Sequence, residues 1–373
     1  MVALARKTLF REWRRFLPAV LTVCFAGLLL IVQAALVLGI FGSAAIYVTA
    51  SSGDLWVGYP GTQSVNLGRP IYRDVEMLLR MNPAVTRVEP FLWVDADWHA
   101  TGVGGVAVSV VGIDPSVKGM VFDHMLSPTL RQDLQEPGSI VVGKADLGQL
   151  GVQAGDHAWI NGHRVHIVAV IPGLRALGGV NVISSLDTAH NLDPHAGFVT
   201  YYVAKLADYA QAPVVAENLN GNPAFGPYQV WTAPAFALRS QLFWMFDTGA
   251  GIAVVFLAVI VVLVGAVIAS QTLTAVVISL AAEYATLNAL GVGMPSLRWV
   301  VMEQATWIGG LGLIGGGLLS AVLLVVAHGQ NVPVAMTPQV GLICGGLVLA
   351  LALISGLLAM RGLLRADPAS LLR

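Results

Sequence analysis

Four long apolar stretches constrain this chain more than any other feature of its sequence. They cover residues 16–47, 249–275, 306–327 and 340–360. About 20 apolar residues in a helix cross the hydrocarbon core of a bilayer, so each stretch is long enough to span a membrane. Charged residues make up only 11% of the chain, whereas soluble domains carry about 25%. The sequence therefore predicts an integral membrane protein with four transmembrane α-helices.

The distribution of Lys and Arg predicts the topology of these helices. Basic residues lie before the first stretch, between the second and third, and after the fourth. Because cytoplasmic loops are enriched in Lys and Arg, both termini and this loop are expected in the cytoplasm. The long segment between the first two stretches then lies on the other side, and its acidic residues outnumber its basic ones. The basic residues that set this topology are Arg6, Lys7, Arg11, Arg14, Arg15, Arg298, Arg361, Arg365 and Arg373.

The expected organisation alternates membrane-spanning and soluble parts. Residues 1–15 combine apolar and basic faces at helical spacing, which is typical of a helix lying among lipid headgroups. A basic anchor with no further role is the alternative for this tail. We expect a cytoplasmic amphipathic helix at 1–15, a transmembrane helix with an extension at 16–48, a periplasmic domain at 49–246, a transmembrane helix at 249–275, a cytoplasmic loop at 276–305, transmembrane helices at 306–327 and 340–360, and a cytoplasmic tail at 361–373.

The large domain between the first two spans is expected to be α+β. A period of two between apolar residues predicts strands, and a period near 3.6 predicts helices. Asn161 and Gly162 separate two alternating runs, which is a strong signal for a two-residue hairpin turn. The expected strands are residues 106–113, 139–142, 164–171, 180–184 and 198–203, and the expected helices are residues 74–81 and 206–218.

Composition and motifs argue against several classes of function. A formal net charge of −1 gives no electrostatic basis for binding nucleic acid. Gly138, Gly143 and Lys144 match part of a nucleotide-binding Walker A loop, but Ala145 stands where a magnesium-binding hydroxyl is required. The sequence contains no glycine-flanked nucleophile of the G-x-S-x-G kind. We therefore expect a non-catalytic chain that binds no cofactor of its own.

Metal binding is not expected either. Cys24 and Cys344 both lie in apolar stretches, and their spacing is not that of a cysteine-based zinc motif. His163 and His166 are three residues apart in an expected strand, so their side chains are expected on opposite faces. Surface histidines are the simpler interpretation.

Residues 283–291, in the expected cytoplasmic loop, form the most informative short segment. Their composition favours a helix that ends at Gly291, and Pro295 opposes simple continuation. Small and apolar side chains at a membrane exit suit docking in a groove of another protein. From these residues alone, a plain helix between two spans is the alternative. The candidate coupling residues are Glu283, Ala285, Thr286, Leu287, Ala289, Leu290 and Gly291.

Glycines and charges in the third and fourth spans indicate helix contacts. A carboxylate near the entry of a span is costly in lipid, so Glu303 is expected to face protein, with Arg298 as a possible partner. Pairs of small residues four apart let transmembrane helices approach closely. Packing within the chain and dimerisation explain such pairs equally well. The pairs are Gly312 with Gly316 and Gly341 with Gly345.

The segment 283–291 resembles the coupling-helix signature of the FtsX-like and MacB-like permeases of ATP-binding-cassette (ABC) systems. The order of one span, a large periplasmic domain and three further spans is that family's plan, a MacB-like type VII permease. Further agreement lies in Leu150-Gly-Val-x-x-Gly155-Asp156 with Asn161-Gly162, in Glu303 with the glycines after it, and in Ala366-Asp367-Pro368-Ala369 with Leu371-Leu372-Arg373. Within the family, the chain most resembles the DevC subgroup, permeases of heterocyst-type glycolipid exporters. The residues that carry this finer resemblance are Asp54-Leu-Trp-Val57, Gln63, Ser64, Asn66, Arg87-Val-Glu-Pro90 and Val111-Gly-Ile-Asp-Pro115.

The resemblance implies a mechanism and a set of partners. Two copies of such a permease pair, and each engages a separate cytoplasmic ATPase that binds ATP and magnesium. Closure of the ATPases pushes on the coupling helices and moves the spans and periplasmic domains, a process called mechanotransmission. DevC-like systems add a periplasmic adaptor and an outer-membrane channel. The implied activity is export of a lipid, a glycolipid or another hydrophobic cargo from the periplasmic side of the bacterial inner membrane.

Two other functions fit parts of the sequence. An FtsX-like regulator has the same architecture and transmits ATPase motion to a periplasmic cell-wall hydrolase. A membrane-anchored periplasmic sensor or binding module belongs to another class and needs no ATPase.

Overall fold

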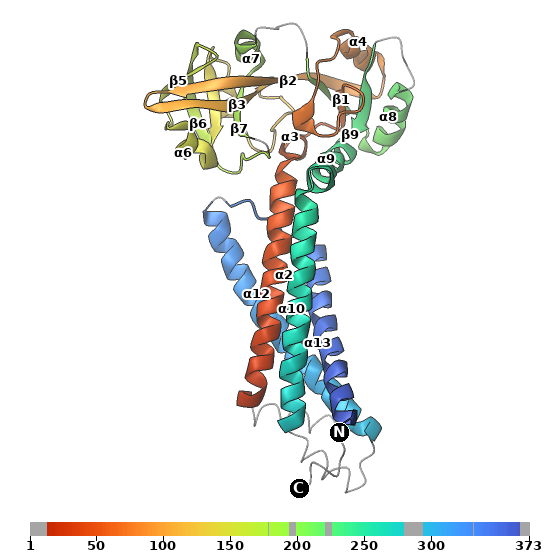
Figure 1. Ribbon diagram of the computed structural model, residues 1–373. Helices are drawn as coiled ribbons and strands as arrows, with labels where there is room; N and C mark the ends of the chain where they lie inside the picture. Colours follow the sequence, from red (N-terminus) through yellow and green to blue (C-terminus); the bar gives the residue numbers. More distant parts are fainter. Residues whose placement is uncertain are drawn as a thin grey trace. The chain divides into compact units, whose positions relative to one another are not determined.

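Figure 1 shows the computed structural model of the chain, which describes residues 13–177, 179–193, 199–220, 226–279, 294–330 and 332–365. The contacts within the chain separate into two compact units. We call Met1–Gly39 with Ile252–Arg373 the helical unit, and Ile40–Gly251 the α+β unit.

Long apolar helices build the described part of the helical unit. Each contains a stretch of 18 residues or more that is apolar enough to cross a membrane. Many of their large apolar side chains point outward, as expected where the surrounding medium is lipid. These helices confirm the predicted architecture, four apolar spans with an α+β region between the first and second. They are α2 (Trp13–Ser43), α10 (Ala250–Ser279), α12 (Met294–Gly329) and α13 (Pro338–Arg365).

The helix α12 begins at Met294, well before the apolar stretch at residues 306–327. Part of the segment expected as a loop, residues 276–305, is therefore helical. Pro295 is compatible with this start because the first turn of a helix makes no use of backbone N–H groups. Composition identified the membrane-crossing part of this helix and not its extension.

A sheet of nine strands forms the centre of the α+β unit, and β2 joins its two parts. Figure 1 shows β2 as one long strand that runs through both parts. Residues Val85–Phe91 of β2 pair with β8, whereas Leu92–Ala100 pair with β3. The strands are β1 (Leu55–Gly58), β2 (Val85–Ala100), β3 (Val103–Ile113), β4 (Ser139–Gly143), β5 (His157–Ile160), β6 (His163–Ile171), β7 (Val180–Ser185), β8 (Tyr201–Leu206) and β9 (Gln229–Thr232).

Six of the strands close into a ring in the order β3-β7-β4-β6-β5-β2, because β2 also pairs with β3. Closure leaves no free sheet edge in this part and encloses a core of alternate side chains. The buried side chains of this core include Trp98, Val110, Ile140, Val142, Ile160, Val165, Ile167 and Val182.

The other part of the sheet, β2-β8-β1-β9, is antiparallel and is covered on both faces. Along β1, Leu55 and Val57 join the core under α4 and α8, whereas Trp56 joins an aromatic core on the opposite face. This alternation follows from the two-residue period of a strand. The helices of this unit with an α-helical backbone are α3 (Ile46–Thr49), α4 (Asp74–Met81), α5 (Pro128–Asp133), α6 (Leu147–Leu150), α7 (Leu186–Leu192), α8 (Ala212–Asn220) and α9 (Ala233–Leu242).

Most of the elements predicted from the sequence are present. The helix at residues 74–81 is α4, and the Asn161-Gly162 turn joins β5 to β6 with positive φ angles of 49° and 81°. The bounds of two elements are corrected. The strand predicted at 198–203 is β8, which begins at Tyr201 and continues to Leu206 because its last residues still pair with β2, Leu206 opposite Val85. The helix predicted at 206–218 therefore begins later, at Ala212, after the 3₁₀ helix η3 (Tyr209–Gln211).

Candidate functional site

The candidate coupling helix lies outside the described residues, which stop at Ser279 and resume at Met294. Its role in binding an ATPase stays a prediction. The residues concerned are Glu283, Ala285, Thr286, Leu287, Ala289, Leu290 and Gly291.

Arg298 and Glu303 both lie in the first turns of α12. The side chain of Glu303 is partly exposed, and that of Arg298 is outside the described side chains. An ion pair between them therefore stays a prediction as well.

Gly312 and Gly316 lie where α12 meets α2, within the helical unit. A Cβ atom added at Gly312 would lie 2.7 Å from the Cβ of Val23. One added at Gly316 would lie 2.7 Å from the carbonyl oxygen of Cys24. Both distances are shorter than Cβ atoms tolerate, so any side chain at these positions would push the two helices apart. The structure therefore assigns this pair to packing within one chain.

Gly341 and Gly345, on α13, have much looser surroundings. A Cβ added at Gly341 would be 3.7 Å from Cε of Met336, and one added at Gly345 would be 3.4 Å from Cδ2 of Leu313. These are ordinary van der Waals distances to flexible side chains. Neither glycine is needed for close approach between the described helices.

An apolar groove of about 410 Å³ runs between α2 and α10 in the helical unit. These helices are joined by a hydrogen bond of 2.9 Å from Nε2 of Gln33 to the carbonyl of Val254. A groove of this kind accepts lipid chains or apolar side chains and offers no polar anchor for a hydrophilic ligand. It is lined by Leu21, Thr22, Phe25, Ala26, Leu29, Ile260, Val261, Val264, Gly265 and Ile268.

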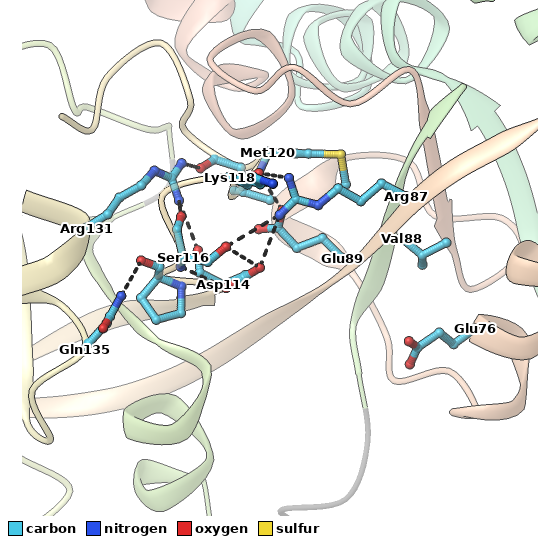
Figure 2. Close-up of polar contacts among 12 residues, drawn as sticks. Glu76, Arg87, Val88, Glu89, Asp114, Ser116, Lys118, Met120, Arg131 and Gln135 are labelled. Carbon is cyan, nitrogen blue, oxygen red and sulfur yellow. Dashed lines mark hydrogen bonds and ion pairs between the residues drawn. The ribbon is translucent and has the colours of Figure 1, made fainter. Parts of the chain in front are cut away.

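In the α+β unit, two buried and two partly exposed charged side chains converge on the loop that follows β3, as Figure 2 shows. Arg87 and Glu89 are two residues apart on β2 and so share a face of that strand. The Arg87 guanidinium lies 3.4 Å from Oδ2 of Asp114, the first residue after β3, and also donates to the carbonyl of Lys118. The Asp114 carboxylate in turn accepts bonds of 2.9 Å from both the N–H and the hydroxyl of Ser116.

Arg131, from α5, reaches the same loop from the other side (Figure 2). Its side chain is almost fully buried and donates to the carbonyl oxygens of Asp114, at 3.0 Å, and Val121, at 2.6 Å. Burial lowers the pKa of Arg131, and the nearby carboxylate of Glu89 opposes this shift most strongly. A buried guanidinium with several carbonyl partners fixes the path of the loop.

Glu89 is the carboxylate at the centre of this polar network, and only 2% of its surface is exposed. Its Oε2 accepts a hydrogen bond from the N–H of Met120, and its Oε1 has no hydrogen-bond partner within the described chain. Burial raises the pKa of Glu89 to about 7, and the bond from Met120 opposes part of that rise. The carboxyl group therefore titrates near neutral pH.

The loop after β3 also holds the segment that leads from α3 to β1. The N–H of Ser52 donates to the carbonyl of Met120 at 3.0 Å, and the N–H of Phe122 donates to the Ser51 hydroxyl at 3.1 Å. These bonds tie the polar network of Arg87, Glu89, Asp114 and Arg131 to the chain that enters the α+β unit from α2.

A second polar cluster holds the segment that leaves this unit toward α10. The indole N–H of Trp244 lies 3.1 Å from the Ser64 hydroxyl and 3.3 Å from Oδ1 of Asn66. Asn66 donates to the carbonyl of Leu177 at 3.2 Å. Trp244 belongs to a five-residue π-helix, η5 (Phe243–Asp247), and π-helical turns are often found at functional sites.

The motif residue Asp54 has a comparable local role. Its buried carboxylate accepts bonds of 2.9 Å from Nζ of Lys205 and from the N–H of Leu206, which joins the start of β1 to β8. Six polar residues of the sequence motifs named above thus form hydrogen bonds within the α+β unit. Those residues are Asp54, Ser64, Asn66, Arg87, Glu89 and Asp114.

Comparisons with known proteins identify one part of the chain. Residues 254–368 match the family model described as FtsX-like permease C-terminal. That region covers most of α10 and the whole of α12 and α13. Among curated proteins, no sequence matches this chain.

Solved structures of permease domains also match, at low sequence identity. The periplasmic region of MacB from Actinobacillus actinomycetemcomitans is 11% identical, with a TM-score of 0.37, and the match covers 51% of this chain and 94% of that one. The extracellular domain of the ABC-type transporter YknZ from Gram-positive bacteria is 13% identical, with a TM-score of 0.35, and the match covers 48% and 100%.

Sequence reasoning missed Arg131 and Trp244. Arg131 is an isolated basic residue in a polar stretch, and nothing near it in the sequence indicates burial. Trp244 lies in the run Phe-Trp-Met-Phe just before an apolar stretch, which is a detectable signal for an aromatic residue at a membrane boundary. Its hydrogen bonds to Ser64 and Asn66 depend on the fold.

Proposed function

We propose that this chain is the permease subunit of an ABC export system and works by mechanotransmission as a homodimer with a separate ATPase. The observation that carries the proposal is the match of residues 254–368 to the FtsX-like permease C-terminal family. The arrangement of one apolar helix, a large α+β unit and three further apolar helices supports it. The chain itself supplies no catalytic group in this proposal, and ATP and magnesium bind to the partner.

The polar contacts described in the helical unit favour a form of export in which cargo does not cross the spans through a hydrophilic path. Three of the described polar side chains of this unit bond to backbone carbonyls of the same unit. Gln33 donates to Val254, Ser320 donates to Gly316 at 2.6 Å, and Ser355 donates to Ala266 at 3.4 Å. Polar groups satisfied in this way are not free to line a water-filled channel. Cargo taken from the periplasmic leaflet or the periplasm agrees with this arrangement.

The two polar clusters of the α+β unit support transmission of motion. One holds the chain just after α2 and α3, and the other holds the chain just before α10. A displacement of either helix is therefore passed to the sheet through hydrogen bonds and a packed core instead of through a loose linker. In this proposal a periplasmic adaptor and an outer-membrane channel receive a lipid, a glycolipid or another hydrophobic cargo, as in DevC-type systems of the bacterial inner membrane with both termini in the cytoplasm.

Co-purification with candidate ATPases tests the proposal. The tagged full-length protein is solubilised in detergent, and wild type is compared with Leu287→Asp, which places a charge in the candidate coupling helix. Leu287→Met keeps an apolar side chain of similar volume and is the matched control. We expect an ABC ATPase to co-purify with wild type and the control and to be lost with Leu287→Asp.

Three results would each overturn part of the proposal. Absence of any ATPase partner for the wild type would contradict the permease function and favour a membrane-anchored binding module. Retention of the ATPase by Leu287→Asp would contradict the coupling role of residues 283–291. A cell-wall hydrolase among the co-purified proteins, with no adaptor, would favour the FtsX-like regulator.

A further inference from the structure

The helix α9 and the π-helix η5 have two opposite faces. Phe236, Ser240 and Trp244 follow each other at intervals of four residues, so they lie along one side of the helical segment. Leu238, Leu242 and Phe246 repeat at the same interval but are offset by two residues. Because each residue of a helix turns by about 100°, the second set lies on the opposite side.

The first set faces the interior of the α+β unit. Phe236 is fully buried, and its ring stacks on that of Trp231 with centroids 4.7 Å apart. The Ser240 hydroxyl accepts a bond of 3.1 Å from the N–H of Val65, and the Trp244 indole is bound by Ser64. These contacts fix the rotation of the helical segment about its axis.

The second set, which we call the outer ridge, faces away from the unit. The exposed fractions are 55% for Leu238, 42% for Leu242 and 50% for Phe246. Arg239, next to Leu238, is exposed as well. Three large apolar side chains in one row are costly in water, and a basic residue beside them is typical of a helix that lies at a lipid surface.

The chain itself limits how far this ridge is from the membrane. The apolar stretch of α10 that is long enough to cross a bilayer begins at Ala250, four residues after Phe246. Four residues span about 6 Å as helix and at most about 14 Å when fully extended, so the ridge lies within or just beyond one headgroup layer, roughly 5–8 Å thick, of the start of this span. Gly249, with φ of 75°, interrupts the helix between the two, so α9 does not have to continue the direction of α10.

We propose that the outer ridge of Leu238, Leu242 and Phe246 rests in the lipid leaflet next to the start of α10, with Arg239 at the level of the lipid phosphates. The ridge gives the α+β unit a contact with the membrane surface in addition to its covalent links. Lipid is the occupant that the chain distance and the neighbouring guanidinium favour over a protein partner. This inference requires α10 to span a membrane and does not require an ATPase.

Site-directed spin labelling of the full-length protein in proteoliposomes of phosphatidylethanolamine and phosphatidylglycerol tests the ridge. The background carries Cys24→Ala and Cys344→Ala, so that a single new cysteine is labelled. Leu242→Cys reports on the ridge, and Val214→Cys, 60% exposed on α8 of the same unit, is the control. Collision rates with oxygen, which concentrates in lipid, and with a nickel chelate, which stays in water, give the depth of each label.

We expect the ratio of oxygen to nickel collisions to be several-fold higher at Leu242 than at Val214. Equal ratios would place the ridge in water and overturn the proposal. Protection of the Leu242 label from both reagents would show that protein covers the ridge, and would also overturn it. If the Leu242→Cys protein is not recovered folded, the same comparison at Leu238→Cys decides between these results.

Discussion

The backbone N–H of Met120 donates a hydrogen bond to the buried carboxyl group of Glu89, which joins β2 to the loop after β3. The same loop receives the guanidinium groups of Arg87 and Arg131 and contains Asp114. The stability of this part of the α+β unit therefore depends on the protonation state of one side chain.

This dependence has a definite sign. The pKa of Glu89 is raised from 4.5 to about 7 in the folded protein, mainly by burial. Between these two values the folded state holds a proton that the unfolded chain has released. The free energy of unfolding therefore falls by up to about 3 kcal/mol, for this one group, as pH rises from about 4.5 to about 7. Above about pH 7 this contribution no longer changes.

Glu89→Gln should remove this pH dependence. Glutamine keeps an oxygen that accepts from Met120 and carries no charge, so the variant does not pay the desolvation cost of a buried carboxylate. We expect a higher thermal midpoint than wild type at pH 8 and little difference at pH 5, measured by tryptophan fluorescence of the detergent-solubilised protein. A variant that is less stable than wild type at pH 8 would show that the charge of Glu89 is required by Arg131.

Trp244→Phe tests the second polar cluster. Phenylalanine keeps an aromatic ring on the π-helix but lacks the indole N–H that donates to Ser64 and Asn66. Loss of a hydrogen bond of this kind costs about 1 kcal/mol, so amide hydrogen exchange of the 3₁₀ helix η1 (Val65–Leu67) should become about five-fold faster.

A matched change controls for the loss of indole in general. Trp159 on β5 is 40% exposed, and Trp159→Phe should leave exchange in η1 at the wild-type rate. Equal exchange rates in the Trp244→Phe and wild-type proteins would mean that packing of the ring, and not the N–H, holds η1.

The sequence predicts those parts of the fold that depend on neighbours along the chain. The apolar spans, the amphipathic helix α4 and the Asn161-Gly162 turn are set by local composition and spacing. The strand β2 was missed because Pro90 lies in its middle, and proline normally excludes a central strand. In the structure Pro90 lies next to the point where β2 changes partner from β8 to β3.

The polar clusters are harder to predict than the helices, because their members come together only in the folded chain. Arg87 and Arg131 lie 44 residues apart in the sequence, yet both donate to the same loop. Arg131 binds backbone carbonyls, which carry no sequence signal. The motif residues Asp54, Asn66 and Asp114 were identified by resemblance, but their hydrogen-bond partners were not.

Asn161 provides a test of the hairpin turn between β5 and β6. Its φ of 49° is tolerated better by asparagine than by alanine. Its Oδ1 accepts from the N–H of Asp97 at 2.9 Å, and its Nδ2 donates to the carbonyl of Leu192 at 2.9 Å. Asn161→Ala loses both bonds and should lower the free energy of unfolding by about 2 kcal/mol, measured by urea titration.

Asn161→Asp separates the two contributions. Aspartate tolerates the left-handed conformation and keeps the acceptor for Asp97, so its effect should be less than half that of Asn161→Ala. Equal losses of unfolding free energy in both variants would mean that the effect comes entirely from the hydrogen bond that Nδ2 of Asn161 donates to the carbonyl of Leu192.

Adjacent glycines on α12 test how the spans pack, because Gly316 and Gly317 point in different directions. A Cβ at Gly316 would meet the backbone of Cys24 and Leu28, at 2.7 and 3.3 Å, whereas no atom outside the immediate helix lies within 4 Å of one at Gly317. Backbone atoms cannot rotate away, so Gly316→Ala must separate α12 from α2, at a cost of about 1–3 kcal/mol. Gly317→Ala adds a better helix former in open space and should be neutral or slightly stabilising.

The thermal midpoints of both variants are measured in detergent. That of Gly316→Ala should lie below the wild-type value, and that of Gly317→Ala should equal or exceed it. A lower midpoint for Gly317→Ala than for Gly316→Ala would mean that the open face of α12 is the packed one, as expected if a second copy of the chain binds there.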